Sequence, residues 1–317
     1  MDLAPMIGYE ALRSSTAWLD LSARGKIKLT GEDRARLLHA MTTNHIQQLT
    51  PGTGCYAFFL NDKGRILSDA NILCRPDHFL LDLEPEARDK IYQHLDHFII
   101  ADDVTLEDVT DALATIAVEG PKAAEVLQAS GAPIPEADYS TVEWGSRVVA
   151  RLNATGSPGF FIFAPAPEKL QVIAQIEAAG AVAGDAEAFR VVRLEHGKAR
   201  YGEDIGERFL AQEANQPRAL HFSKGCYLGQ EIVERVRSRG QIHRMLMPLV
   251  LDTKVPPEPG TKLQTGETNV AEITSAAYSP ALDKVVALAY VRTEQARPHT
   301  EIQLGEIHAE VVAPAAD

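Results

Sequence analysis

The sequence has little cysteine and none of the common metal-binding spacings. Its 317 residues include 3 cysteines, Cys55, Cys74 and Cys226, and neither a Cys-x-x-Cys nor a His-Glu-x-x-His motif. Cysteines that are few and scattered are typical of a protein in a reducing compartment, and their odd number argues against a disulfide framework. Structural zinc sites and protein-held iron–sulfur clusters both need clustered ligands. We therefore expect no resident metal site.

Long apolar runs and excess positive charge are missing as well. The formal net charge is -13, with 45% hydrophobic and 24% charged residues, which is the balance of a globular chain. Such a negative chain is a poor general binder of nucleic acid or of anionic membranes. No basic segment followed by an apolar one opens the sequence, so no secretory signal is expected. These features predict a cytoplasmic protein with neither nucleic acid nor membrane among its partners.

The sequence also lacks a glycine-rich phosphate loop and a regular alternation of strands with helices. Residues 25–31 alternate polar and apolar side chains, as a strand does, and residues 32–41 carry a helical apolar stripe. Residues 55–60 and 65–73 flank a tight Asn-Asp-Lys-Gly turn, which predicts a hairpin. Helices mixed with antiparallel hairpins indicate the α+β class.

The chain is too long for one ordinary core, so two or three domains are expected. After Arg244, short runs of strand composition alternate with turn signals and no helical pattern intervenes. This arrangement predicts a small all-β barrel. We divide the chain into an N-terminal α+β region over residues 1–112, a second α+β region over 113–241 that is interleaved with the first, and a C-terminal β-barrel over 242–317.

One stretch of the second region, residues 224–231, places a thiol in a setting that favours reactivity. Lys224 lies two residues before Cys226, and a neighbouring cation stabilises a thiolate. Gly225 and Gly229 flank the thiol and allow close approach of the backbone to a ligand. A helical pattern follows Gly229, so the helix dipole would also favour an anion here. The alternative is an inert cysteine buried in a loop, which is the more common case.

Basic residues gather around this stretch. The segment from 224 to 244 contains Lys224, Arg235, Arg237, Arg239 and Arg244, against Glu231 and Glu234. In a chain of net charge -13, such a patch predicts an anion site built from arginine forks. A solvated helix face with internal ion pairs is an equal alternative.

Two carboxylates and three histidines complete the candidates. Glu195, in an Arg-Leu-Glu-His-Gly segment that closes a predicted helix, can accept paired hydrogen bonds from a heterocycle. Asp89 is a candidate general base. For both residues a place on the surface is the more frequent alternative. His196, His221 and His243 have no ligand spacing, and we interpret them as structural or exposed.

Several motifs occur together in an order that resembles the folate-binding superfamily of the glycine-cleavage T-protein (aminomethyltransferase). Each motif is weak alone, and the ordered set is specific. The segments that carry the resemblance are residues 19–22, 25–31, 41–44, 61–69, 118–121, 193–197, 201–204 and 224–231.

Within that superfamily the chain looks most like the YgfZ branch, whose members support assembly or repair of iron–sulfur proteins. Aminomethyltransferases carry an acidic residue where this chain has Cys226. Residues 153–159 also lack the tyrosine and glutamate of the matching T-protein segment. The branch signature, Lys-Gly-Cys-aromatic-x-Gly-Gln-Glu, is matched here at every fixed position: Lys224, Gly225, Cys226, Tyr227, Gly229, Gln230 and Glu231.

The resemblance implies a ring of about three domains around a central hole that holds tetrahydrofolate, with the first region binding folate and the barrel last. Glu195 matches the family glutamate that binds the pterin ring. Asp89 falls where aminomethyltransferases keep a catalytic aspartate, although residues 82–84 replace the Asn-Ala that normally precedes it. The basic patch, with Arg244, would engage the glutamyl tail of the folate.

Three functions remain open, and the sequence does not decide whether the protein is an enzyme. The leading hypothesis is a tetrahydrofolate-binding protein that supports iron–sulfur cluster assembly or repair, with Cys226 and Lys224 as its reactive pair. Its partners would be iron–sulfur assembly factors or client proteins. One alternative is an aminomethyltransferase that works with a lipoyl carrier protein. The other is a non-catalytic scaffold that senses folate.

Overall fold

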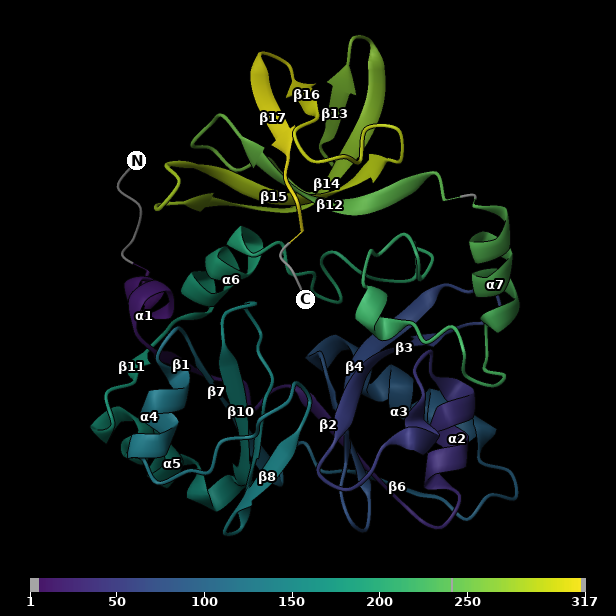
Figure 1. Ribbon diagram of the computed structural model, residues 1–317, viewed down its shortest axis with the longest axis vertical. Helices are drawn as coiled ribbons and strands as arrows, with labels where there is room; N and C mark the ends of the chain where they lie inside the picture. Colours follow the sequence, from purple (N-terminus) through teal and green to yellow (C-terminus); the bar gives the residue numbers. More distant parts are fainter. Residues whose placement is uncertain (1–5, 241, 315–317) are drawn as a thin grey trace.

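A computed structural model describes residues 6–240 and 242–314. Figure 1 shows three units arranged around a centre: two α+β units side by side and a barrel above them. The α+β class and the C-terminal β-barrel are confirmed, since a closed six-stranded barrel follows two antiparallel-rich sheets with helices.

The first unit is a five-stranded antiparallel sheet in the order β3-β4-β5-β2-β6. The predicted hairpin is its β3–β4 pair, whose turn is held by Asn61, since its side-chain oxygen accepts from the backbone of Lys63 and Arg65. The elements are β2 Gly25–Thr30, α2 Arg34–Met41, β3 Gly54–Leu60, β4 Ile66–Cys74, β5 Phe79–Leu83, α3 Arg88–Phe98 and β6 Thr105–Asp108.

The second unit is a six-stranded sheet in the order β11-β1-β7-β10-β9-β8, parallel only between β1 and β11. Its strands are β1 Ala17–Asp20, β7 Leu113–Glu119, β8 Thr141–Trp144, β9 Arg147–Ala150, β10 Gly159–Pro165 and β11 Val182–Ala183. Its helices are α1 Tyr9–Ser14, α4 Ala123–Ala129, α5 Lys169–Ala178 and α6 Ala186–Glu195.

Strand β10 shows why this sheet faces two cores. Phe160 and Ile162 belong to the cluster under α4 and α5, whereas Phe161 and Phe163 belong to the large central cluster. Successive side chains of a strand point to opposite faces, so an almost wholly apolar strand is buried on both sides. One face of this sheet is thereby directed to the centre of the molecule.

The barrel closes in the order β12-β15-β14-β13-β16-β17. Closure leaves no free sheet edge. Alternation along β15 fills the barrel interior with Ala287 and Ala289 while Leu288 and Tyr290 pack outward on the central cluster. The strands are β12 Arg244–Leu251, β13 Lys262–Thr265, β14 Thr268–Ser279, β15 Lys284–Arg292, β16 Glu301–Leu304 and β17 Ile307–Val311.

The two α+β units are interleaved along the chain in a way that differs from the predicted division at residue 112. Strand β1 lies in the second sheet although the first sheet follows it in sequence. Residues 217–239, with the Lys-Gly-Cys stretch and α7 (Gln230–Arg239), return to the first unit: His221 N donates to Thr43 O and Leu228 N to Ala40 O. The motif thus packs on the first unit. The predicted boundary at residue 241 lies outside the described residues.

Short helical turns and modest helix lengths complete the fold. Helix α3 has 11 residues, whereas a membrane crossing needs about 20 apolar ones. Over residues 6–240 and 242–314, no helix is both long and apolar enough to cross a membrane. Single-turn 3-10 helices lie at Ile46–Gln48, Pro85–Ala87, Ala166–Glu168 and Pro217–Ala219.

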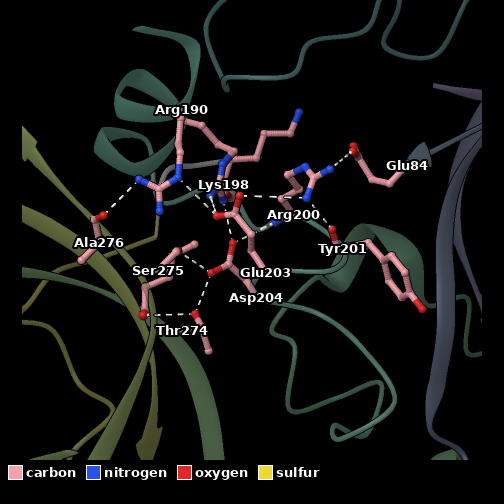
Figure 2. Close-up of polar contacts among 12 residues, drawn as sticks. Glu84, Arg190, Lys198, Arg200, Tyr201, Glu203, Asp204, Thr274, Ser275 and Ala276 are labelled. Carbon is pink, nitrogen blue, oxygen red and sulfur yellow. Dashed lines mark hydrogen bonds and ion pairs between the residues drawn. The ribbon is translucent and has the colours of Figure 1, made fainter. Parts of the chain in front are cut away.

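Asp204 fastens the barrel to α6. Its fully buried carboxylate accepts from Arg193 Nη1 at 2.6 Å, from Thr274 Oγ1 at 2.6 Å and from Ser275 Oγ at 2.5 Å. Figure 2 shows the contacts of Asp204 with Thr274 and Ser275 of β14. A buried charge is stable only when it is paired and hydrogen-bonded, so this network fixes how the barrel sits on the second unit.

Candidate functional site

A cavity of about 1000 Å³ lies at the centre of the molecule. Both sheets, α6 and the loops that follow α6 contribute to its wall, and Pro314 reaches it from the C-terminal end. A cavity of this size holds a drug-sized or cofactor-sized molecule. Its walls come from positions between residues 19 and 218, plus residue 314, and several of them lie in the segments 19–22, 61–69, 193–197 and 201–204 that carry the family resemblance.

Aromatic and basic side chains dominate the polar character of this wall. Aromatic rings come from Tyr56, Tyr139, Phe161 and Phe189. Basic side chains outnumber acidic ones, although the whole chain has a net charge of -13. The basic residues are Arg24, Arg151, Arg190, Arg193, Lys198, Arg200 and Arg218, and the acidic ones are Asp20, Asp69, Glu84, Asp138 and Glu203.

Two carboxylates hold the guanidinium of Arg24. Its Nε and Nη2 donate to the two oxygens of Asp82 at 2.8 and 2.9 Å, and Nη1 pairs with Glu84. Burial alone would lower the pKa of Arg24, but the two carboxylates raise it. Asn71 also donates to Asp82 at 2.8 Å. This satisfied cluster braces the cavity wall on the first sheet.

Asp69 is the carboxyl group of the cavity best suited to proton transfer. It is 8% exposed, and Tyr56 OH donates to it at 2.7 Å. Burial, together with the charge of Glu84, raises the pKa of Asp69 to about 6. A group that titrates near neutral pH can serve as a general acid or base.

Lys198 presents an amine to the same cavity. Its Nζ donates to the backbone and side-chain oxygens of Asn153. Burial lowers the pKa of Lys198 to about 7, and the positive charge of Arg218 acts in the same direction. The carboxylate of Glu119 opposes this shift, but it is itself occupied by Ala154 N, Thr155 N and Thr155 Oγ1.

The predicted thiol site lies apart from this cavity. Cys226 is exposed and is not one of the cavity-lining residues. Lys224 is only 7% exposed and donates through Nζ to the carbonyls of His39 and Thr42. Burial lowers the pKa of Lys224 to about 7. The ammonium therefore points into the first unit and does not supply the charge that we expected beside Cys226.

The buried ammonium instead faces another thiol. Burial raises the pKa of the Cys55 thiol to about 12, and Lys224 partly opposes that increase. Lys224 also lies over the Tyr227 ring, 4.6 Å from its centroid. Its position thus fixes the loop that carries Cys226, while the functional role of Cys226 stays a prediction.

The other motif residues also shape this loop. Gly229 has φ 84° and caps α7, and a Cβ there would lie 2.7 Å from the carbonyl oxygen of Asn61. Gly225 passes close to His39 Nε2, at 3.6 Å from a would-be Cβ. Gln230 begins α7, and Glu231 is exposed and pairs with Arg235. In this stretch, glycine is required by backbone geometry at Gly229.

The basic patch corresponds to the second alternative, an ion-paired helix face. Arg235 pairs with Glu231 and Arg237 with Glu234 at i+4 and i+3 spacing. In the part of the chain that the structure describes, no residue of α7 lines the cavity. The proposed contact of this patch with a folate tail therefore has no support from the geometry.

Arg244, expected to bind the cofactor, is instead part of the junction with the barrel. It pairs with Glu213 at 3.1 Å and lies over the rings of Phe209 and Tyr290, which stack on each other at 3.6 Å. Arginine commonly stacks on aromatic faces in this way. Arg244 is not a cavity-lining residue.

Glu195 and Asp89 also lie outside the lining. Glu195 accepts from Ser279 Oγ at 2.6 Å, from Tyr9 OH and from the Arg13 guanidinium, and so joins α1, α6 and β14. Asp89 is 73% exposed and pairs with Arg88 at 2.8 Å. The pterin and catalytic assignments of these residues stay predictions from the resemblance.

Two of the histidines considered from the sequence, His196 and His221, lie in different parts of the molecule. His196 lines the cavity, with Nδ1 at 3.0 Å from Thr155 O. His221 joins His39 and His45 in a row of rings, with centroids 4.6 and 5.2 Å apart. Among residues 6–240 and 242–314, no group of three or more His, Cys, Asp or Glu side chains is placed to hold a metal.

Known proteins share this architecture over the whole chain. The model for the GCVT N-terminal domain matches residues 7–224, and that for the glycine cleavage T-protein C-terminal barrel domain matches residues 244–316. The chain belongs to the glycine-cleavage T-protein family. This result confirms the superfamily inferred from the ordered motifs. It does not distinguish the YgfZ branch, which stays a prediction from residues 224–231.

Individual relatives agree with this family. The chain is 28% identical over 297 residues to an aminomethyltransferase of Rubrobacter xylanophilus, covering 90% of this chain and 78% of the relative. It is 30% identical over 296 residues to an aminomethyltransferase of Deinococcus deserti, covering 90% and 79%. The crystal structure of the glycine cleavage system aminomethyltransferase T from Bartonella henselae superposes with a TM-score of 0.88 at 21% identity, over 97% of this chain and 88% of that one. That likeness shows the fold.

Proposed function

We propose that this T-protein family member binds a reduced folate, tetrahydrofolate or a close derivative, in the central cavity and acts there on one-carbon chemistry. The observation that carries the proposal is the cavity of about 1000 Å³, whose wall combines aromatic rings with a surplus of basic side chains. A folate is a flat heterocycle joined to carboxylates, so both halves have matching surfaces. The aminomethyltransferase relatives support the same ligand class.

Particular residues suit each part of such a ligand. Tyr56 on β3 and Phe161 on β10 line the cavity from the two different sheets. The Asp69 carboxylate can accept hydrogen bonds from the N–H groups of a heterocycle. Such bonds are stronger than those to a neutral acceptor because the carboxylate is charged. Arg151, 40% exposed and paired with Asp138 at 3.2 Å, can exchange that surface carboxylate for a folate carboxylate. Surface ion pairs are worth little, so the exchange costs little.

A transferase-like reaction is the first candidate for the chemistry. The relatives are named aminomethyltransferase, which favours transfer of a one-carbon unit. Asp89 is on the surface here, so in our proposal Asp69 is the cavity carboxyl group that moves the proton. Asp69 titrates near neutral pH because it is buried, and this matches the requirement for an acid–base group.

A role in iron–sulfur cluster assembly or repair is the second candidate, favoured by the exposed Cys226. In that case the folate cavity and the thiol serve different molecules, since Cys226 is not a cavity-lining residue. One cysteine cannot hold a conventional cluster, so an assembly factor or client protein would supply the remaining ligands.

Calorimetric titration with tetrahydrofolate tests the shared part of both candidates. We expect wild type and Cys226→Ala to bind equally. Asp69→Asn, which keeps an acceptor for Tyr56 OH, should bind at least about tenfold more weakly, because a charge-assisted hydrogen bond is lost. Glu195→Gln tests whether the pterin is bound by Glu195, as the resemblance implies, or by Asp69 in the cavity. Failure of wild type to bind any reduced folate would overturn the proposal.

The two candidates are separated by activity. Cys226→Ala should abolish complementation of a strain deficient in iron–sulfur repair if the thiol acts on a partner. It should leave one-carbon transfer with purified components unchanged. Asp69→Asn should show the opposite pattern if the cavity performs the chemistry.

A further inference from the structure

Lys198 is a buried amine that the folate-binding proposal leaves without a task. It follows α6 and its side chain reaches the wall of the central cavity. Figure 2 shows it extending away from the carboxylates of Glu203 and Asp204, toward which the neighbouring arginines turn. Its amine therefore does not belong to the network that fastens the barrel.

The contacts of the Lys198 amine are unusual for a buried lysine. Its two hydrogen-bond acceptors are both neutral oxygens of Asn153. Glu119, the carboxylate that acts on it from β7, already accepts three hydrogen bonds from the Ala154–Thr155 segment. Charged groups from several elements act on this amine: Arg24, Asp69, Glu119 and Arg218.

This arrangement favours the neutral amine. Burial lowers the pKa of Lys198 to about 7, so the neutral form, with its free lone pair, is populated near neutral pH. A neutral lysine in a desolvated pocket is the form that adds to carbonyl groups. Access to the cavity provides the second requirement, a route for the carbonyl compound.

We propose that Lys198 is an imine-forming amine that captures a small aldehyde, at the oxidation level of formaldehyde, inside the central cavity. The inference rests on the proposed one-carbon function and names its substrate class. It assigns a role to a side chain that lines the cavity and makes hydrogen bonds only to neutral oxygens within the described residues.

The step balances without an oxidant or a reductant. The amine nitrogen adds to the carbonyl carbon, and the carbonyl oxygen takes up both amine protons and leaves as water, so that a C–N double bond replaces the C–O bond. Asp69, on the same cavity wall, can relay one of these protons from the nitrogen to the departing oxygen because its pKa lies near 6. An amine of a second molecule in the cavity then adds to the imine carbon and releases Lys198 unchanged.

Lys224 provides a matched control within the same chain. Burial lowers the pKa of both lysines to about 7. Lys224, however, is 7% exposed and is held against the carbonyls of His39 and Thr42, away from the cavity. A difference in reactivity between the two amines therefore reports access to the cavity. Lys122, which is exposed, represents an ordinary surface amine.

Reductive methylation of the wild-type protein tests the proposal. The protein is treated briefly with formaldehyde and cyanoborohydride at neutral pH, and the methylated lysines are quantified by peptide mass spectrometry. We expect methylation of Lys198 to be at least about tenfold faster than that of Lys122 or Lys224, because only Lys198 combines a lowered pKa with access to the cavity. Saturating 5-formyltetrahydrofolate, which does not react with formaldehyde at N5, should protect Lys198 and leave Lys122 unaffected.

Several outcomes would overturn the inference. If Lys198 is methylated no faster than Lys122, its amine is not unusually reactive. If Lys224 is methylated as fast as Lys198, access to the cavity does not explain the reactivity. If 5-formyltetrahydrofolate binds in calorimetry while Lys198 stays unmodified, this inference fails and the proposed function stands. If Lys198 is labelled rapidly but no reduced folate binds, aldehyde capture stands and the folate proposal fails.

Discussion

The central cavity and the Cys226 loop use charged residues in opposite ways. Around the cavity, basic side chains come from distant positions and outnumber the acidic ones. In the loop the charged residues are close in sequence and are satisfied locally: Lys224 donates to two backbone carbonyls, and Arg235 and Arg237 pair with Glu231 and Glu234. The cavity thus keeps a surplus of basic side chains, whereas the charged residues of the loop hold one local structure.

The difference shows that a contiguous motif and a functional surface need not coincide. Within residues 224–231, Lys224 and Gly229 fix backbone position, and Cys226 is left exposed. The cavity wall has no contiguous signature of this kind, because its residues come from several separate segments and meet only after both sheets and α6 have packed. Substitutions that alter either the cavity or the Cys226 loop, and leave the other unchanged, test this difference.

The largest expected effect is on the frame of the cavity. Asp204→Ala removes the acceptor of Arg193, Thr274 and Ser275, and leaves a buried guanidinium without its closest partner. Breaking such a pair costs about 3–5 kcal/mol of unfolding free energy. Urea denaturation measures the loss, and reduced-folate affinity should fall with it.

Glu203→Ala is the matched control for that prediction. Its carboxylate also pairs with Arg193, at 2.8 Å, but is 30% exposed. The loss should be about 1 kcal/mol or less, since partly exposed pairs contribute little. Equal destabilisation by the two variants would contradict the role assigned to Asp204.

The next effect separates the two buried lysines. Lys224→Met leaves the carbonyls of His39 and Thr42 without a donor in a dry site, whereas Lys198→Met exposes the oxygens of Asn153 to a cavity that water can enter. We expect Lys224→Met to be less stable than Lys198→Met by about 1–3 kcal/mol, the cost of unsatisfied buried acceptors. Thermal unfolding followed by circular dichroism at neutral pH provides the comparison, and the reverse order would refute it.

A third prediction concerns the pH dependence of stability at Asp69. Burial raises its folded pKa from 3.8 to about 6, so the folded state binds more protons than the unfolded state between these values. Ionisation at neutral pH therefore destabilises the fold at this site, and acidification relieves the cost. Asp69→Asn should be more stable than wild type at pH 7, on the order of 2–3 kcal/mol, and the gain should fade as the pH falls from about 6 to about 4. A constant gain at every pH would contradict a titrating Asp69.

Local rules predicted the parts of this structure that depend on neighbouring residues. The β3–β4 hairpin follows from its turn sequence, since Asn61 bonds to the turn backbone and Gly64 adopts φ 67°. The barrel follows from short strand-forming runs separated by turn signals. The ordered motifs gave the superfamily, because several weak matches occurred in the right sequence.

Side-chain direction was the part that the sequence could not supply. Lys224 is two residues from Cys226, yet its ammonium turns inward because two carbonyls of α2 and its cap are available there. Asp69 and Lys198 are 129 positions apart in the sequence, and only tertiary packing brings them to the same cavity wall. No periodicity marks either residue, although the raised pKa of a buried carboxyl group marks Asp69 once the fold is known.

The smallest expected effect is that of Cys226→Ala. The residue is exposed, and the loop around it is held by Lys224 and Gly229. Surface substitutions of this kind change the unfolding free energy by about 0.5 kcal/mol or less, and the cavity should bind tetrahydrofolate as wild type does. Urea denaturation and calorimetric titration measure these two properties. A marked loss of stability or of tetrahydrofolate binding would show that the Cys226 loop and the cavity are coupled. Loss of partner-dependent activity alone, with both properties intact, would place the function of the thiol on the surface of the first unit.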